Sequence, residues 1–219
     1  MTPPAATPPA ASAEPEIAEI DTPHGPARIT VLDVPGARAT LLLGHGAGGG
    51  ITAPDLVVAA GAAVAAGVRV VLGEQPYRVA GRRAPAPAGQ LDTAWLAVVR
   101  DVRDRFAGPL LVGGRSSGAR VACRTATGAG AAGVLCLAFP VHPPGRPEKD
   151  RLAELAMPTV PVLVVQGATD PFGRPEPAPG RRVVVLRGDH SLRADAPGLR
   201  AAVRDWLRER DLAGAAAPA

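Results

Sequence analysis

Residues 109–120 read PLLVGGRSSGAR: an apolar run leads into a cluster of small residues and two adjacent serines. The apolar part is typical of a buried strand, and the pattern of the next segment, residues 117–128, is typical of a helix. The stretch therefore predicts a strand that turns sharply into a helix. Units in which strands and helices alternate in this way build layered α/β folds.

The glycines around the serine pair indicate which serine lies at the turn. Gly114 and Gly118 stand two residues before and two residues after Ser116, which fits the motif G-x-S-x-G. A very sharp strand-to-helix turn forces those two positions together, so both must be small. In the register of Ser117, one of the two positions would hold Arg115, which is too large. We therefore expect Ser116 to be the nucleophile and Ser117 to offer a backbone N–H. The alternative is a plain tight turn with two solvated serines.

Apolar runs and helical patterns alternate along the rest of the chain. Strands are predicted at 27–34, in the first part of 39–50, and at 68–74, 109–114, 132–140, 160–167 and 181–188. Helices are predicted at 52–67, 91–108, 117–128, 148–156 and 197–210. The later strands are almost entirely apolar, as parallel strands buried on both faces are. The sequence therefore predicts an α/β fold, a three-layer αβα sandwich around an open, mostly parallel sheet.

Two details of this prediction concern a helix end and a lid. Thr52 is expected to cap the first turn of the helix 52–67, and Gly67 is expected to close its last turn. About twenty residues with one short helix separate the strands 132–140 and 160–167. We therefore expect no lid domain at that place.

The carboxyl ends of the strands carry further candidate residues, and ligands of open parallel sheets bind at those ends. Asp170 follows the strand 160–167, and His190 follows the strand 181–188. Each has an ordinary explanation when taken alone, since aspartate is a common turn former and a loop histidine is often incidental. Together with Ser116 they follow one another in the order Ser, Asp, His, which is the order of the α/β-hydrolase triad. We expect these three residues to be catalytic.

A glycine loop follows an earlier strand, where residues 45–50 read HGAGGG. Small residues there let backbone N–H groups approach a developing oxyanion, so Gly46 and Ala47 are expected to form an oxyanion hole with Ser117. His45 is expected to orient the loop. A phosphate-binding loop is excluded because no Lys-Ser or Lys-Thr pair follows the glycines.

Five segments resemble one family: LLGHGAGG, LVGGRSSGAR, FPVHPPGRPEK, VQGATDPFG and GDHSL. The resemblance covers about residues 27–210 and points to the small α/β-hydrolase-like family related to dienelactone hydrolases. That family includes bacterial predicted hydrolases, testis-expressed hydrolase-like proteins and a subunit of the NSL chromatin complex. The resemblance implies an α/β-hydrolase fold, while some members serve as scaffolds. The chain differs from dienelactone hydrolase itself, which has cysteine at the nucleophile position that Ser116 occupies.

These observations predict a serine hydrolase that cleaves a small-molecule carboxylic ester, or a thioester or amide, through an acyl-enzyme. This chemistry requires no metal and no organic cofactor. The alternative is a non-catalytic interaction module that keeps the fold. Four further residues are candidates for lining the substrate site: His45, His142, Arg82 and Arg83. For His142 we favour a role in holding its proline-rich loop, and the two arginines have the ordinary alternative of being solvated surface charges.

Composition limits the remaining possibilities. The formal net charge is +4, but the arginines are scattered among acidic residues and no aromatic-studded basic patch is present, so nucleic-acid binding is not expected. No stretch is long and apolar enough to span a membrane, and no signal peptide is present, so the cytoplasm is the expected location. Cys123 and Cys136 are expected to be buried free thiols. The sequence predicts no oligomeric state.

Domain boundaries follow from the same composition. Residues 1–16 are rich in proline and alanine and are expected to form a disordered tail. Residues 17–212 are expected to form one α/β-hydrolase domain, and residues 213–219 a second disordered tail.

Overall fold

The computed structural model describes residues 14–210. Their strands form one eight-stranded sheet in the order β1-β2-β4-β3-β5-β6-β7-β8. The strands are β1 (Glu16–Ile20), β2 (Ala27–Leu32), β3 (Thr40–Gly44), β4 (Arg69–Glu74), β5 (Leu110–Arg115), β6 (Gly133–Leu137), β7 (Val162–Gly167) and β8 (Arg181–Leu186). β2 pairs antiparallel with both β1 and β4, and every other neighbouring pair is parallel. The predicted open, mostly parallel sheet is confirmed.

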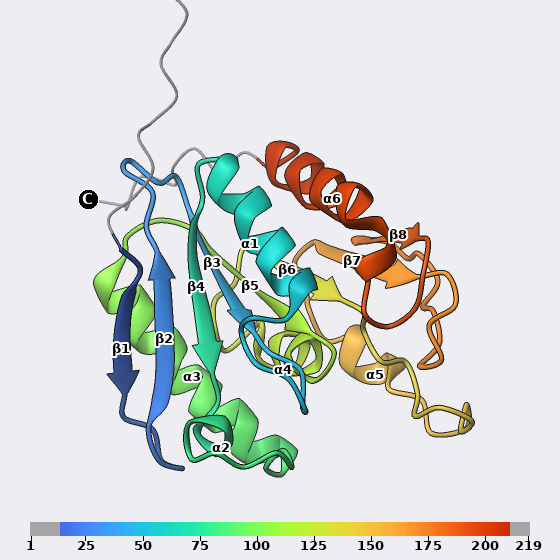
Figure 1. Cartoon of the computed structure of the whole chain (residues 1–219), viewed down its shortest axis with the longest axis horizontal. Helices are drawn as coiled ribbons and strands as arrows, with labels where there is room; N and C mark the ends of the chain where they lie inside the picture. Colours follow the sequence, from blue (N-terminus) through green and yellow to red (C-terminus); the bar gives the residue numbers. More distant parts are fainter. Residues whose placement is uncertain (1–13, 211–219) are drawn as a thin grey trace, which may run out of the picture.

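Helices cover both faces of this sheet (Figure 1). They are α1 (Pro54–Ala65), α2 (Pro76–Val79), α3 (Ala88–Arg105), α4 (Ser117–Thr125), α5 (Leu152–Leu155) and α6 (Ala196–Arg208), with a 3₁₀ turn at Arg193–Asp195 before α6. One hydrophobic core lies between the sheet and α3 and α4, and a second lies between the sheet and α1 and α6. The three-layer architecture is therefore the predicted one.

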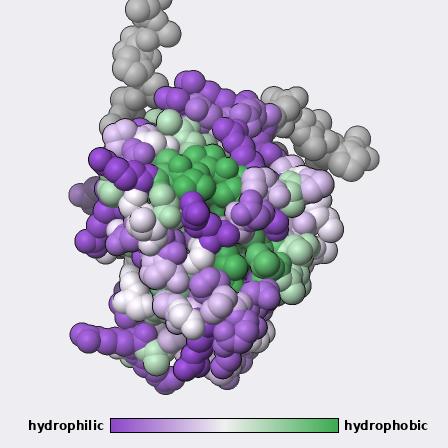
Figure 2. All heavy atoms as spheres, turned by 90° about the vertical axis from the view of Figure 1, so that its right-hand side faces the viewer, coloured by the Kyte–Doolittle hydropathy of each residue, from purple (hydrophilic) through white to green (hydrophobic). Residues whose placement is uncertain are grey.

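The burial of each strand follows its sequence pattern. Every residue of β6 and β7 is buried, because helices cover both faces, and both strands are apolar runs. β2 alternates between buried and half-buried residues. β8 lies at an edge of the sheet, and its Val185 is 48% exposed. Figure 2 views the molecule from the right-hand side of Figure 1 and shows apolar areas that interrupt a hydrophilic surface.

Several boundaries differ from the predictions. β1 was not predicted, and it begins at Glu16, inside the expected tail and one residue before the expected start of the domain. The short helix α2 lies in a stretch that carries no predicted helix, and the helix predicted at 148–156 is limited to Leu152–Leu155. Residues 1–13 and the predicted tail at 213–219 lie outside the described residues.

The predicted cap of α1 is wrong. The helix starts one residue later than a Thr52 cap requires: its N-cap is Ala53, Pro54 holds the first position, and no side chain caps it. Asp55, three residues after Thr52, is buried instead. At the other end, Gly67 has a φ of 75°, the left-handed conformation that ends helices, as predicted.

Two features are absent from residues 14–210. None of their helices is both long enough and apolar enough to cross a membrane. In the described segment between β6 and β7, α5 is the only helix, so no lid domain is inserted there. This segment leaves the carboxyl end of β6, and the carboxyl ends of the parallel strands all lie at one edge of the sheet.

Candidate active site

Ser116 lies at the turn between β5 and α4. Its φ of 52° and ψ of −110° lie in a region that residues other than glycine rarely adopt. Its backbone N–H donates to the carbonyl oxygen of Leu137 at the end of β6, at 2.9 Å, which fixes the turn against the neighbouring strand. Strain of this kind persists only where the surroundings impose it, and it is concentrated at functional sites.

The glycines that flank Ser116 meet as the motif requires. A Cβ placed on Gly114 would lie 2.5 Å from the carbonyl oxygen of Gly44 and 2.8 Å from the carbonyl carbon of Gly118. A Cβ placed on Gly118 would lie 2.7 Å from the carbonyl carbon of Gly44. These separations are shorter than real Cβ atoms tolerate, so the predicted size limit at both positions is confirmed.

Three side chains from separate strand ends form a continuous chain of hydrogen bonds. His190 Nε2 lies 2.9 Å from Ser116 Oγ, and His190 Nδ1 lies 2.8 Å from Asp170 Oδ2. Because the Asp170 carboxylate only accepts, the proton of a neutral His190 ring belongs on Nδ1, which leaves Nε2 free to accept from the serine hydroxyl. The Asp170 side chain is fully buried. The structure thus brings together the three residues that the sequence predicted as catalytic.

Two residues that the sequence analysis missed hold this chain in place. Gln166, at the end of β7, donates from Nε2 to Asp170 Oδ2 at 2.7 Å and to the carbonyl oxygen of Phe139 at 3.1 Å. Phe172 donates its backbone N–H to Asp170 Oδ1 at 2.8 Å, and its ring centroid lies 4.2 Å from that of His190. A single amide side chain inside the apolar run VLVVQG was a signal that could have revealed Gln166.

The glycine loop after β3 is held by the segment that follows β4. The N–H of Gln75 donates to His45 Nε2 at 3.0 Å, so the ring proton lies on Nδ1 and faces the carbonyl oxygen of Gly46 at 2.8 Å. The hydroxyl of Tyr77 donates to the carbonyl oxygen of Ala47 at 2.8 Å. His45 and Tyr77 also pack edge to face, at 5.7 Å between ring centroids. His45 therefore orients the loop from within it.

Burial sets the protonation of these two clamping side chains. Burial lowers the pKa of His45 below its ordinary value, against the opposing effect of its bond to Gly46. Burial raises the pKa of Tyr77, which keeps its hydroxyl protonated and able to donate. Both side chains therefore stay uncharged donors to backbone carbonyls of the glycine loop.

The chain matches a known sequence family over most of its length. Residues 37–196 match a family described as alpha/beta hydrolase domain. The chain belongs to the alpha/beta hydrolase family. A comparison with curated protein sequences gave no match.

Solved structures of α/β hydrolases share this fold at low sequence identity. A lidless α/β serine hydrolase from Xanthomonas campestris is 22% identical, with a TM-score of 0.70, over 92% of this chain and 97% of that one. An α/β serine hydrolase homologue from Coxiella burnetii is 20% identical, with a TM-score of 0.71, over 90% and 100% of the two chains. An esterase from Pyrococcus furiosus is 15% identical, with a TM-score of 0.73, over 90% of each.

The largest hollow near the catalytic candidates of this hydrolase lies on the side of α1. Its volume is about 430 Å³, and its lining includes the glycine loop, Arg115, Ser191 and Arg193. Arg115 and Ser191 are the chain neighbours of Ser116 and His190. Ser116 and His190 themselves are not among the residues that line this hollow.

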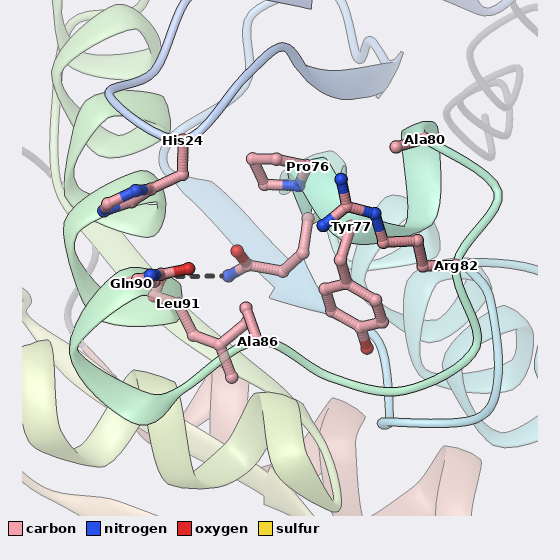
Figure 3. Close-up of a pocket in the computed structure, with 9 residues that line it drawn as sticks. His24, Pro76, Tyr77, Ala80, Arg82, Ala86, Gln90 and Leu91 are labelled. Atoms are coloured by element: carbon pink, nitrogen blue, oxygen red, sulfur yellow. Dashed lines mark hydrogen bonds between the residues drawn. The ribbon is translucent and has the colours of Figure 1, made fainter.

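A smaller hollow of about 60 Å³ is lined by residues that include Tyr77 and Arg82, and Figure 3 shows these side chains. Gln90 and Leu91 of α3 line it as well. Both Arg82 and Arg83 are exposed, and Arg82, unlike Arg83, is among the residues that line this hollow.

His142 is held by neighbouring loops. Its Nδ1 lies 2.9 Å from the carbonyl oxygen of Pro143, and its backbone N–H donates to the carbonyl oxygen of Phe172. Its ring packs against Gly173, where a Cβ would lie 2.6 Å from Nε2. These contacts join the loop after β6 to the loop that carries Asp170, in keeping with the favoured role of His142 in holding its loop.

Proposed function

We propose that this protein is a serine hydrolase that cleaves carboxylic esters through an acyl-enzyme, with Ser116, His190 and Asp170 as its triad. The observation that carries the proposal is the unbroken chain of hydrogen bonds from Asp170 through His190 to a serine in strained backbone geometry. Thioesters and amides follow the same chemistry and are the neighbouring substrate classes. We further propose, from the sequence segments quoted above, that the protein is related to dienelactone hydrolases.

The chemistry proceeds in two halves. Ser116 Oγ attacks the ester carbonyl carbon while His190 Nε2 takes the hydroxyl proton, and Asp170 stabilises the resulting imidazolium. The bond to the leaving alkoxide then breaks, and His190 returns the proton to that oxygen. In the second half, His190 removes a proton from water, the hydroxide attacks the acyl carbon, and the proton returns to Ser116 as the acid leaves. No step of this scheme calls for a metal or an organic cofactor.

The developing oxyanion would be bound by backbone N–H groups of Ser117, Gly46 and Ala47. Ser117 is the first residue of α4, where N–H groups have no partner within the helix and the helix dipole favours negative charge. Gly46 and Ala47 lie in the loop that His45 and Tyr77 hold by its carbonyl oxygens. Such fixed donors contribute about 3 kcal/mol each to transition-state stabilisation in related chemistry.

The chemistry of the cysteines supports a reducing compartment such as the cytoplasm. Cys123 and Cys136 are free thiols with their sulfur atoms 3.5 Å apart. In a compartment where disulfides form, two thiols this close together would be liable to oxidation to a disulfide.

The decisive experiment is labelling with a fluorophosphonate probe together with hydrolysis of p-nitrophenyl acetate. Ser116→Ala is expected to abolish labelling and to lower kcat by about 10³-fold or more, because the nucleophile is lost. Ser117→Ala is the matched control and keeps much of both, since Ser117 contributes only a backbone group. Equal loss in the two variants would refute the assignment, and an unlabelled parent protein would favour the alternative of a non-catalytic interaction module.

We also propose that Arg82 favours anionic esters. What supports this proposal is that a guanidinium suits a carboxylate, and that the segment with Arg82 follows β4, whose carboxyl end lies at the same edge of the sheet as that of β5. Arg82→Ala is expected to raise KM several-fold for an ester that bears a free carboxylate, with kcat largely kept, because a binding contact is lost while the reacting groups are untouched. Arg83→Ala serves as the control, because Arg83 is also exposed but is not among the residues that line the hollow beside Tyr77. Equal turnover of charged and neutral esters by the parent protein would contradict this preference.

A further inference from the structure

Arg115 connects three segments of the candidate site. Its Nε donates to Asp55 Oδ2 at the start of α1, at 2.8 Å. Its Nη2 donates to the backbone carbonyl oxygen of His190, at 3.2 Å. Its Nη1 lies so close to Gly46 that a Cβ on that glycine would be only 2.8 Å away. The Arg115 side chain, adjacent in sequence to Ser116, therefore contacts α1, the glycine loop and the loop that carries His190 (residues 187–192, the histidine loop).

Asp55 is placed to anchor this arginine. Its side chain is only 1% exposed, while that of Arg115 is 21% exposed. Its second oxygen, Oδ1, accepts from the N–H of Leu56, so both oxygens have partners. A buried carboxylate costs several kcal/mol unless it is paired and hydrogen-bonded, so the pair fixes the direction of the guanidinium. A lysine ammonium group could not replace this guanidinium, whose planar shape holds its N–H donors in two fixed directions.

We infer that Arg115 is a positioning residue of the proposed active site, which places the backbone of His190 so that its ring reaches both Ser116 and Asp170. This inference rests on the proposed function, because it assigns a role within that triad. It follows from the contacts that join the residue before the nucleophile to the carbonyl of the base. The strand-to-helix turn at Ser116 and the histidine loop then move as one unit. The distance from His190 Nε2 to Ser116 Oγ is thereby fixed.

The expected effect is on the rate and not on substrate binding. A displacement of a catalytic group by about 1 Å can lower a rate 10²-fold. Loss of Arg115 is therefore expected to lower kcat by about 10- to 100-fold while KM stays within about twofold, because Arg115 acts through His190.

The test must separate positioning from stability, because Arg115→Met alone leaves a buried, unpaired Asp55. The double variant Asp55→Asn/Arg115→Met removes both charges, and its asparagine can still accept from Leu56. Arg115→Lys keeps the charge without the fork. Arg187→Met is the matched control, since Arg187 donates from an exposed position to the carbonyl oxygen of Ala194, in the 3₁₀ turn that follows the histidine loop. For each variant we would measure melting temperature, kcat, KM and the ¹⁵N shifts of the His190 ring.

We expect the double variant and Arg115→Lys to melt near the temperature of the parent protein. Their kcat should nevertheless be about as low as that of Arg115→Met, and their His190 ring shifts should report a mixture of tautomers. Arg187→Met should keep the parent kcat and the single Nδ1-protonated tautomer. Recovery of kcat together with melting temperature in the double variant, or unchanged ring shifts in both Arg115 variants, would overturn the inference. If the parent protein hydrolyses no ester, the proposed function fails, and the ring shifts alone decide the inference.

Discussion

At the scale of single residues, the close contact between Gly114 and Gly118 predicts that a side chain at either position destabilises the protein. Gly118→Ala is expected to lower the free energy of unfolding by about 1–3 kcal/mol, because the added methyl group meets the backbone of Gly44. The proposed esterase activity should fall as well, since the turn that holds Ser116 must shift. Urea denaturation followed by circular dichroism measures the stability change.

Gly61 provides the control for this substitution. It lies within α1, and a Cβ there would have no neighbour within 4 Å. Gly61→Ala is expected to raise stability by up to about 1 kcal/mol, since alanine is the better helix former. A Gly118→Ala protein as stable as the Gly61→Ala protein would contradict the close packing of the elbow.

The sequence alone predicted those residues whose roles depend on near neighbours in the chain. The glycine register around Ser116 selected one serine of two, and its reason, backbone contact between Gly114 and Gly118, is present in the structure. Gln166 and the Arg115–Asp55 pair were not predicted. Arg115 and Asp55 are sixty residues apart, and only the folded sheet shows that they meet.

At the scale of elements, the clamp on the glycine loop makes stability depend on pH. Burial lowers the pKa of His45 below its unfolded value of 6.5. Between the two values the unfolded chain binds a proton at His45 that the folded chain does not, so the free energy of unfolding falls as pH falls. We therefore expect the parent protein to lose stability from this group as the pH falls from 7 to 5.

His45→Gln is expected to flatten this pH dependence, because glutamine does not titrate. Its amide can still accept from Gln75 and donate to Gly46. Thermal melts at a series of pH values measure the slope, with His24→Gln, an exposed histidine, as the control. If the His45→Gln slope equals the parent slope, His45 is not the group responsible.

Elements differed in how far the sequence predicted them. The apolar strands β5, β6 and β7 were predicted because burial on both faces leaves a continuous apolar run. The edge strand β1 was missed because it is mostly exposed and reads EIAEI, with no apolar run. The four-residue helix α2 was missed because its stretch is too short to show a helical period. Thr52 was assigned as a cap from spacing alone, and the helix starts at Pro54 instead.

At the scale of the whole molecule, the two cysteines report on global unfolding. Cys123 of α4 and Cys136 of β6 are both buried. Their mutual hydrogen bond, together with burial, raises the pKa of Cys136 well above its ordinary value, so its reactive thiolate is scarce. A thiol reagent such as Ellman's reagent should react at least about 100-fold more slowly with native protein than with unfolded protein, because the molecule must open first.

Small amounts of denaturant should accelerate this reaction in proportion to the population of open molecules. Rapid labelling of one thiol per native chain would contradict the burial of both residues. Cys136→Ser, which leaves Cys123 alone, shows whether the two thiols become accessible in the same opening event.

The short connection between β6 and β7 makes this protein a ready host for domain grafting. Its stretch 144–150 is fully exposed, and it leaves the same edge of the sheet that carries Ser116. Exposed loops of this kind tolerate inserted domains better than buried segments do. A small cap domain grafted there would roof the face that is now open to solvent, and the choice of cap would set which substrates can enter. A grafted cap could then be exchanged for another without altering the proposed catalytic residues.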